Sequence, residues 1–499
     1  MKVRSCLPLP YRNYFLFGFV VMIITAWFSV GAHHPDEYYQ VFEFANYKMG
    51  HTPVADLPWE FAAQCRPALQ PFIVVILSKV LEILGMYNPF VVAFILRLLM
   101  GILSYWVICR WIVSLLPTFT TEKGKKLFVC CSLFLWFIPY ISVRFSAENI
   151  GAQLFLLALS IITQIPKYRF RKQLLGLSIA GLLLGFACFV RIQMGFAFLG
   201  LVIWLILQKW SLNKWMIMGL FCLIAIGTCV IIDHWFYDAW IFTPFNYFNV
   251  NIIEHRAADF GVFPWWYYFS TFLKVGAPPI SIVLLVLFLR GIYKKPLHIL
   301  SIVCTCFLLG HFFIGHKEMR FLFPMSLPFI FLACIGLDLW LQRYPKKRFY
   351  GWVWGVLVFI NSGLLLFRMI TPAHEIVKNY EFIYNYCAKR NTILVSFDDM
   401  PYTLGTSTKI YFYRPNNLTI VRLKDSTELK NILNHANGQA VLLYGNVPLD
   451  SRLAGYNIKR LYCLFPEWVL KFNINNWQAR SYISAVYEVS PYSLNTLRK

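Results

Sequence analysis

Long apolar runs dominate the pattern of the chain between residues 14 and 370. A helix needs roughly 17–25 apolar residues to cross a bilayer. The runs predict eleven membrane-spanning helices, at 14–32, 90–116, 127–145, 151–166, 173–190, 195–208, 215–233, 277–290, 297–315, 321–341 and 349–370. The first run is longer than the apolar part of a typical signal peptide, so we expect a membrane anchor there. The pattern predicts a mainly α-helical, polytopic membrane protein.

The run at 68–85 needs separate treatment because it carries Lys79 and Glu82. Counting it as a span would place basic loops on both faces, whereas Lys and Arg normally collect on the cytoplasmic face. We therefore expect a helix that lies on or re-enters the outer leaflet, with twelve or thirteen spans as the alternative. The N-terminus and five loops then share the cytoplasmic face, with Lys2, Arg4, Arg12, Lys123, Lys125, Lys126, Lys167, Arg169, Arg171, Lys172, Lys209, Lys214, Arg290, Lys294, Lys295, Arg343, Lys346, Lys347 and Arg348.

Composition agrees with this interpretation. The 499 residues are 59% apolar and only 14% charged, which excludes a soluble enzyme, a disordered chain and a fibrous repeat. Lys and Arg number 46 against 23 Asp and Glu, but their position in the predicted cytoplasmic loops removes the argument for nucleic-acid binding. Nearly all acidic residues before residue 338 fall on the opposite, outer face. That face is where we expect the chemistry.

Residues 371–499 have ordinary polarity and predict a small α/β domain outside the membrane. Short β-like runs occupy 392–397, 409–413, 418–423, 440–444 and 483–489, and 425–436 reads as a capped helix. We therefore divide the chain into a transmembrane catalytic domain at 1–370, with a first outer loop at 33–89, and this C-terminal domain. Cys387 and Cys463 either pair or stay as free thiols, and Asn417 begins an N-glycosylation pattern.

The first outer loop begins with an acidic pair in the segment HHPDEYYQ. Acidic residues at the mouth of a membrane helix are costly unless they are solvated, paired or used. Pro35 can begin a helix, which would place Asp36 and Glu37 in its first turn, where the dipole tolerates carboxylates. Helix capping and catalysis are equally good interpretations of this pair at this stage.

A basic cluster lies between the ninth and tenth predicted spans, in GHKEMRFLFP. In a helix His316, Lys317 and Arg320 would share one face near its N-terminus, where an anion is favoured. Arg supplies a forked donor and Lys a point charge, which suits a phosphate. The alternative is an interfacial pair neutralised by Glu318. We favour phosphate binding because excess positive charge is not expected on the outer face.

Other clusters extend this face. Residues 233–268 are rich in aromatic side chains, including Trp265 and Tyr267, which suits an interfacial belt or a platform for a sugar or lipid carrier. Glu60 and Arg66 add an acid and a base to the first loop, and Arg144 with Glu148 suggests a structural ion pair. No Cys or His spacing typical of a metal site is present.

Five short motifs occur in the order of a known enzyme family: HPDEYYQ at 34–40, PWEF followed by Arg66, DHWFYDAWIFTPFNYFNV at 233–250, PWWYY at 264–268 and HKEMRFLFP at 316–324. The chain resembles dolichyl-phosphate-mannose-dependent α-mannosyltransferases, most closely the GPI mannosyltransferase 3 group. The likeness covers most of residues 14–340.

The resemblance implies a GT-C fold and a multi-pass enzyme of the endoplasmic reticulum membrane with a lumenal active site. A bacterial inner-membrane enzyme with a periplasmic site would fit the same topology. The donor would be a polyprenyl-phosphate mannose and the acceptor a glycan or glycolipid, with inversion to an α-mannosidic bond. Asp36 would be the catalytic base, with Glu37 as its helper.

The expected roles of the remaining residues follow from this chemistry. His316, Lys317 and Arg320 would bind the donor phosphate, and the substrates would contact His34, Glu60, Arg66, Trp265 and Tyr267. A lipid phosphate is a good leaving group, so no cofactor is required, although a divalent ion between acidic residues stays an open alternative. The alternative functions are a lipid-linked sugar transporter or flippase, a GT-C enzyme that uses another sugar, and a non-catalytic membrane subunit.

Overall fold

The computed structural model describes residues 9–167, 169–344, 348–397, 401–404, 408–436, 438–447, 451–453, 455–481 and 483–490. Lys2, Arg4, Lys346 and Lys347 of the predicted cytoplasmic face lie outside these residues. Contacts divide the chain into two units. We call Met1–Ser29, Trp59–Leu77 and Ala93–Thr371 the helical unit, and Val30–Pro58, Ser78–Val92 and Pro372–Lys499 the sheet unit.

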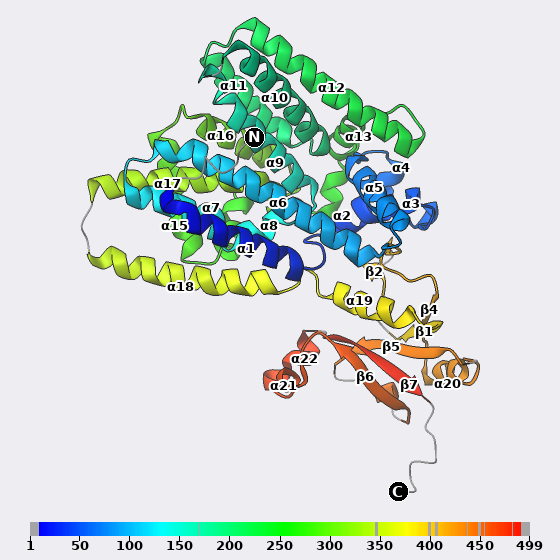
Figure 1. Cartoon of the computed structure of the whole chain (residues 1–499). Helices are drawn as coiled ribbons and strands as arrows, with labels where there is room; N and C mark the ends of the chain where they lie inside the picture. The colour runs from blue at the N-terminus through cyan, green and yellow to red at the C-terminus, as the bar shows by residue number, and fades with distance from the viewer. Residues whose placement is uncertain are drawn as a thin grey trace. The chain divides into compact units, whose positions relative to one another are not determined.

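All eleven predicted apolar runs are helical in the structure (Figure 1). They form α1 Arg12–Phe28, α6 Pro89–Leu115, α7 Glu122–Phe134 with α8 Phe137–Ser142, α9 Ala147–Ile162, α10 Phe170–Val190, α11 Met194–Leu207, α12 Leu212–Tyr237, α15 Ile280–Lys294, α16 Ile299–Phe313, η9 Met319–Met325 with α17 Ser326–Arg343, and α18 Arg348–Ile370. Residues 68–85 contain α5 Leu69–Ile83, which continues from the helical unit into the sheet unit.

The run at 127–145 differs from its prediction because it is broken between α7 and α8. Leu135 is extended, so backbone groups beside it lose their helical partners. Asn361 on α18 replaces them: its Oδ1 accepts from the Trp136 N–H at 3.0 Å and its Nδ2 donates to the Phe134 carbonyl at 2.8 Å. Backbone groups must be satisfied within the protein in a bilayer, which explains an Asn in the otherwise apolar α18.

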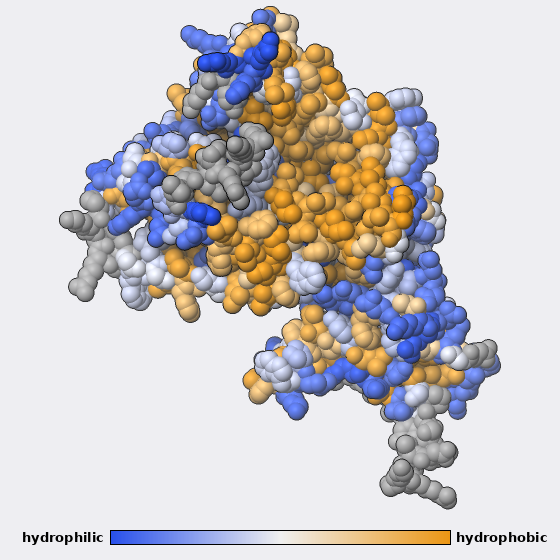
Figure 2. Space-filling view, in the orientation of Figure 1, coloured by the Kyte–Doolittle hydropathy of each residue, from blue (hydrophilic) through white to orange (hydrophobic). Residues whose placement is uncertain are grey.

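Membrane spanning is supported by the length and composition of these helices. In the described part of the chain, five helices pass this test, α15 with α16 passes as a pair bent by 118°, and three apolar helices are shorter. Figure 2 shows apolar residues over a broad face of the helical unit, and Leu220, Leu223 and Ile231 of α12 are more than half exposed. The chain is a multi-pass membrane protein, whereas the number of eleven spans stays a prediction.

Small residues allow the helices to approach closely. α10 packs along α12, and Gly181 and Gly185 face it. A Cβ atom would lie 2.3 Å from the Met218 carbonyl oxygen at Gly181 and 2.5 Å from that of Cys222 at Gly185. Small residues four apart bring backbones together in membrane helices, where dispersion contacts replace the hydrophobic effect.

The sheet unit contains a five-stranded sheet of order β4-β1-β5-β7-β6. β1 Thr392–Ser396 pairs in parallel with β4 Leu418–Arg422 and β5 Ala440–Asn446, and β7 Ser484–Ser490 is antiparallel to β5 and to β6 Asn457–Cys463. The small α/β fold predicted for this region is confirmed, and α20 Ser426–Asn434 is capped by Asp425.

Some local predictions for this region were wrong. The run at 409–413 contributes only β3 Thr408–Lys409, which pairs with β2 Thr403–Leu404. The strand β6 and the helix α19 Ile376–Cys387 were not predicted. Cys387 and Cys463 are both free thiols.

The beginning of the first outer loop belongs to the sheet unit, which differs from the division predicted at residue 370. The carbonyl of Val30 accepts from the N–H groups of Ala373 at 2.8 Å and His374 at 3.1 Å. Gly31 has φ +89°, and a Cβ atom there would lie 2.8 Å from His374. A continuous helical segment follows, made of α2 Pro35–Glu37, the π-helix η3 Tyr38–Glu43 and α3 Phe44–Lys48.

Candidate functional site

The acidic pair of the first outer loop begins the helical segment of the sheet unit, as its proline predicted. Pro35 occupies the first turn of α2, and the His34 imidazole lies at the N-cap, with Nδ1 3.3 Å from the backbone nitrogen and from Oδ1 of Asp36. Glu37 Oε1 accepts from the His33 N–H at 3.0 Å. The pair therefore splits: Glu37 has a capping role, while the Asp36 side chain is 25% exposed beside His34.

Side chains behind this turn fix its position. Tyr38 is buried, its hydroxyl accepts from the Ala32 N–H at 3.0 Å, and it lies 3.0 Å from Nδ1 of His374. Burial raises the pKa of Tyr38 and lowers that of His374, so both stay neutral near pH 7. The loop that carries Asp36 is thus anchored to the residues that follow α18.

A buried charge cluster occupies the helical unit. Glu148 lies in the first turn of α9, Arg191 at the end of α10, and Arg320 in η9. Glu148 Oε1 lies 3.1 Å from Arg191 Nη2 and 3.7 Å from Arg320 Nη1. All three side chains are less than a tenth exposed. Such a group is costly to bury unless its charges are matched, so these positions are strongly constrained.

The predicted basic cluster joins this group, but not as one helical face. His316, Lys317 and Glu318 precede η9, and Glu318 is extended with φ −129°. Glu318 accepts from Arg320 Nε at 2.6 Å and Nη2 at 3.0 Å, and its Oε1 lies 3.0 Å from His316 Nε2. The predicted shared face was wrong because residues 315–318 are held against the loop before α14, where Gly315 accepts from the Phe263 N–H at 3.0 Å.

Protonation of His316 is favoured in this arrangement. The hydrogen bond to Glu318 raises the pKa of His316, and its Nδ1 lies 3.0 Å from the Gly261 carbonyl. Lys317 is 2% exposed and donates to the carbonyls of Phe312 and Ile314. The Lys317 ammonium therefore satisfies the C-terminal end of α16, a favourable place for a cation, and burial lowers its pKa.

Two buried donors have capacity left for a ligand. The Tyr268 hydroxyl and Arg191 Nη2 are two of the buried polar atoms in the described residues that have no hydrogen-bond partner of favourable geometry, although Arg191 Nη2 lies 3.1 Å from Glu148. Tyr268 is 2% exposed in α14 Tyr267–Val275, and electrostatic interactions link it to Glu318 and Arg191. Both arginines lie over the ring of Phe321. The guanidinium carbon of Arg191 is 5.0 Å from the ring centroid, and that of Arg320 is 5.4 Å from it. Unsatisfied buried donors are rare in proteins and call for an explanation.

The second charged pair of the first outer loop lies in the helical unit. Arg66 Nη2 is 3.5 Å from Glu60 Oε1, and the Arg66 guanidinium lies 5.2 Å from the Tyr247 ring centroid. Tyr247 accepts a 3.0 Å hydrogen bond from Gln193, two residues beyond Arg191. Polar contacts therefore lead from the predicted pair towards the segment that carries Arg191.

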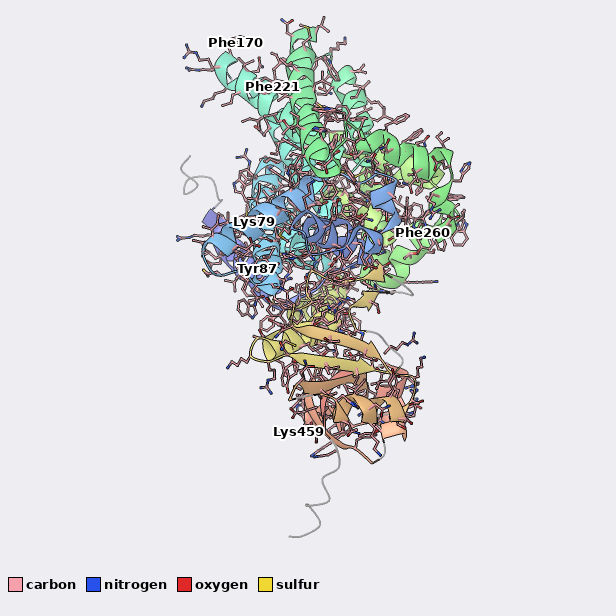
Figure 3. The ribbon with its side chains drawn as sticks, turned by 90° about the vertical axis from the view of Figure 1, so that its right-hand side faces the viewer. Lys79, Tyr87, Phe170, Phe221, Phe260 and Lys459 are labelled. Atoms are coloured by element: carbon pink, nitrogen blue, oxygen red, sulfur yellow. The ribbon has the colours of Figure 1, made fainter. Side chains whose placement is uncertain are left out.

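The aromatic residues predicted to bind substrate differ in exposure. Trp265 is 60% exposed and packs against Phe269 and Phe312. The Tyr267 ring lies 4.4 Å from that of Phe263. Phe260 projects from the same loop segment (Figure 3). The exposed rings suit contact with lipid or a substrate, whereas their neighbour Tyr268 faces the charge cluster.

Arg191 and Tyr268 were not among the predicted site residues. Arg191 ends the apolar run at 173–190 on the side opposite the basic loop at 167–172, so it falls on the predicted outer face. The argument that singled out Lys317 and Arg320 applies to it equally. Tyr268 has no comparable signal, because it is one of many aromatic residues between 233 and 268.

The cluster suits an anion. Arg191, Arg320 and Lys317 outnumber the carboxylates of Glu148 and Glu318. Arginine donors held in place by carboxylates are pre-organised for the oxygens of a phosphate. Among the residues that the structure describes, no three His, Cys, Asp or Glu side chains form a group that could hold a metal ion.

The architecture defines the class of protein. The crystal structure of ArnT from Cupriavidus metallidurans bound to undecaprenyl phosphate aligns with 96% of this chain and 98% of its own, with a TM-score of 0.55 and 12% identity. The structure of the same ArnT in the apo state aligns with a TM-score of 0.52. This likeness shows a membrane protein of the GT-C fold, as the sequence resemblance implied.

The chain belongs to the Alg9-like mannosyltransferase family, whose model matches residues 14–407. It is 27% identical over 336 residues to the GPI alpha-1,2-mannosyltransferase 3 of Mus musculus, covering 64% of this chain and 57% of the relative. The GPI mannosyltransferase 3 of Candida albicans is 24% identical, with 81% and 77% covered. A probable Dol-P-Man:Man(7)GlcNAc(2)-PP-Dol alpha-1,6-mannosyltransferase of Schizosaccharomyces pombe is 31% identical over 194 residues, 36% of this chain and 34% of the relative. The chain thus spans little more than half the length of the mouse relative it matches.

Proposed function

We propose that the protein transfers mannose from a polyprenyl-phosphate carrier, dolichyl phosphate in a eukaryote, to a hydroxyl of a glycan or glycolipid, with inversion to an α-mannosidic bond. Family membership and the names of the mannosyltransferase relatives support the sugar and the carrier. Several relatives carry names of GPI mannosyltransferases, which supports a GPI-like glycolipid as acceptor and the endoplasmic reticulum membrane as location. The reaction would take place on the outer, lumenal face.

The chemistry is a single displacement at the anomeric carbon. Asp36 takes the proton of the acceptor hydroxyl, whose oxygen forms the new bond while the bond from the anomeric carbon to the phosphate oxygen breaks. The electron pair leaves with the lipid phosphate, so one base suffices and no covalent intermediate is needed. His34 lies against Asp36, and Glu37 holds the turn that carries the base.

The observation that carries this proposal is the buried cluster of Arg191, Arg320 and Glu148. Negative charge on the phosphate grows as the glycosidic bond breaks, and donors fixed in advance stabilise that charge without reorganising. Arg320 and His316 keep their expected place as phosphate-binding residues, and Arg191 joins them. Lys317 contributes positive charge from behind, because its ammonium is bonded to backbone carbonyls.

Substrate contacts complete the proposal. Glu60 and Arg66 offer hydroxyl-binding groups to a sugar, and Trp265 and Tyr267 offer ring faces to the sugar or the lipid chain. The arginine side chains of the site match the negative charge of the lipid phosphate, so the proposed reaction needs no metal ion. Transfer is therefore expected to continue at an unchanged rate in excess EDTA.

A lipid-donor assay tests the function directly. The full-length protein, purified in detergent, receives radiolabelled dolichyl-phosphate mannose and a mannose-terminated glycolipid. The expected product carries one further mannose that α-mannosidase removes and β-mannosidase does not. Movement of labelled donor across vesicle membranes without a new glycosidic bond would instead show a transporter, and a labelled product only with another sugar donor would show a different GT-C enzyme.

A further inference from the structure

The sheet unit contains a cavity of about 520 Å³ that the reaction at Asp36 does not use. Its walls come from the α3 end of the helical segment, the loop between α5 and α6, the helix α19 and the segment 411–417. All of these residues belong to one unit. The volume falls in the range of sites that hold small ligands.

Aromatic side chains form one part of the lining. They are Tyr87, which Figure 3 marks in the loop after α5, and Tyr384, Tyr411 and Phe412. Phe412 stacks on Phe42 at 4.7 Å between centroids, and the Tyr411 hydroxyl donates to Asp56 at 2.5 Å. Lys409 lies 3.1 Å from the same Asp56 carboxylate. The rings of Tyr411 and Phe412 are therefore held in place before any ligand arrives.

Amide and basic side chains form the other part. Asn46, His51, Arg414, Asn416 and Asn417 line the cavity, and its described lining contains no carboxylate. His51 and Asn416 are exposed at the rim. Asn46 and Asn417 already donate within the protein, to Thr52 and to the carbonyls of Cys387 and Arg390. The exposed imidazole of His51 and amide of Asn416 can both donate and accept hydrogen bonds, which matches the hydroxyl groups of a sugar. The C–H faces of a sugar ring can pack on aromatic rings, so this lining suits a carbohydrate better than a lipid chain or a metal ion.

The cavity is connected to the proposed base through one continuous helical segment. Residues 35–48 form a continuous helical stretch that carries Asp36 at its start and Asn46 near its end. Ten residues of helix correspond to about 15 Å. Glu43 in the same stretch accepts from the N–H groups of Tyr411 and Phe412, both at 2.9 Å, and so ties the cavity wall to this segment.

We propose that this cavity binds an oligosaccharide portion of the acceptor, several sugar units away from the hydroxyl that receives mannose. Its assignment to the acceptor rests on the proposed transferase function. The proposal predicts that the enzyme prefers acceptor glycans above a certain length, because only a glycan that reaches from Asp36 to the cavity contacts both sites.

Binding of α-mannotriose to the full-length protein in detergent, followed by saturation-transfer NMR, tests the cavity. The double variant His51→Ala/Asn416→Ala removes two exposed rim groups, and Asn434→Ala/His435→Ala at the C-terminal end of α20 is the matched control. We expect the rim variant to weaken mannotriose binding about ten-fold or more, as for the loss of hydrogen bonds to a ligand, while the control binds like wild type. Absence of binding to wild type, or equal binding by both variants, would overturn the proposal.

A second measurement separates this inference from the proposed function. Arg191→Gln should raise the KM for the mannose donor and keep mannotriose binding unchanged. A wild-type protein that binds mannotriose at the rim residues but forms no glycosidic bond would refute the transferase and leave the carbohydrate site standing. Transfer that proceeds with an unchanged acceptor KM in the rim variant, together with unchanged mannotriose binding, would refute the site and leave the transferase.

Discussion

Arg191 and Arg320 both approach the same carboxylate oxygen of Glu148, at 3.1 Å from Nη2 of Arg191 and 3.7 Å from Nη1 of Arg320. The three residues come from different helical elements and are buried together. A carboxylate between two guanidinium groups fixes their positions. Under the proposed function, this relationship supplies fixed positive charge for the leaving lipid phosphate.

Arg191→Gln should raise the KM for dolichyl-phosphate mannose about ten-fold or more, because a charged hydrogen-bond donor to the phosphate is lost. Arg191→Lys should fall between Gln and wild type, since the charge remains without the fork. Arg256→Gln is the control, because that arginine is half exposed and pairs with Asp259 at 3.7 Å. Steady-state kinetics over a series of donor concentrations measure the effect. Equal donor KM in the Arg191 and Arg256 variants would remove Arg191 from the phosphate site.

Asp233 should be important for stability. It is buried, and its carboxylate accepts from the Ala68 N–H at 2.7 Å and from the Thr243 hydroxyl at 2.6 Å. Asp233→Ala leaves both donors unsatisfied and should destabilise the fold by about 2–4 kcal/mol. Thermal unfolding in detergent should show a lower Tm, whereas Asp259→Ala at an exposed position should not. An unchanged Tm for the Asp233 variant would contradict this role.

Glu43 should make the sheet unit less stable as the pH rises. Burial raises the pKa of Glu43 to about 7, with a contribution from nearby Asp56, despite hydrogen bonds from Phe412, Thr52 and Tyr411. The folded state binds the proton of this carboxyl group more tightly than the unfolded state does. The free energy of unfolding therefore falls between about pH 4.5 and pH 7 and does not change further at higher pH. The shift corresponds to roughly 3 kcal/mol.

Glu43→Gln tests this dependence. Its amide oxygen can accept from the same backbone N–H groups, and its nitrogen can donate to Thr52, so the packing is kept without the charge. The Tm of the variant should change less between pH 5 and pH 8 than that of wild type. Glu82→Gln, at a partly exposed ion pair with Lys79, is the control. A wild-type Tm that is independent of pH over this range would show that ionisation of Glu43 does not destabilise the fold.

The helices of this fold could be predicted because a membrane span requires a long apolar run, which is visible in the sequence. The break at Leu135 could not, since it depends on Asn361 more than two hundred residues later. Likewise, β6 alternates weakly in burial, and its pairing with β7 is decided by contacts distant in sequence. The first outer loop is bonded to residues 373–374 through Val30 and to residues 411–412 through Glu43, which no local pattern indicates.

The candidate site was predictable where residue type and topology coincide. Asp36 and Arg320 stood out as charges on the predicted outer face, and the helix start expected at Pro35, beside Asp36, is confirmed. The helical face expected for His316 and Arg320 failed because Glu318 and Gly315 take part in contacts that keep this segment extended. Tyr268 acquires its significance only from an unsatisfied hydroxyl inside the fold.

The activity of Asp36→Asn tests the central claim most directly. Mannose transfer from dolichyl-phosphate mannose to a glycolipid is measured for wild type, Asp36→Asn and the control Glu82→Gln under the same conditions. We predict a loss of about 10²–10⁴-fold in kcat for Asp36→Asn, with an unchanged donor KM, because a general base is removed while the phosphate site is intact. Transfer by Asp36→Asn as fast as by wild type would contradict the account.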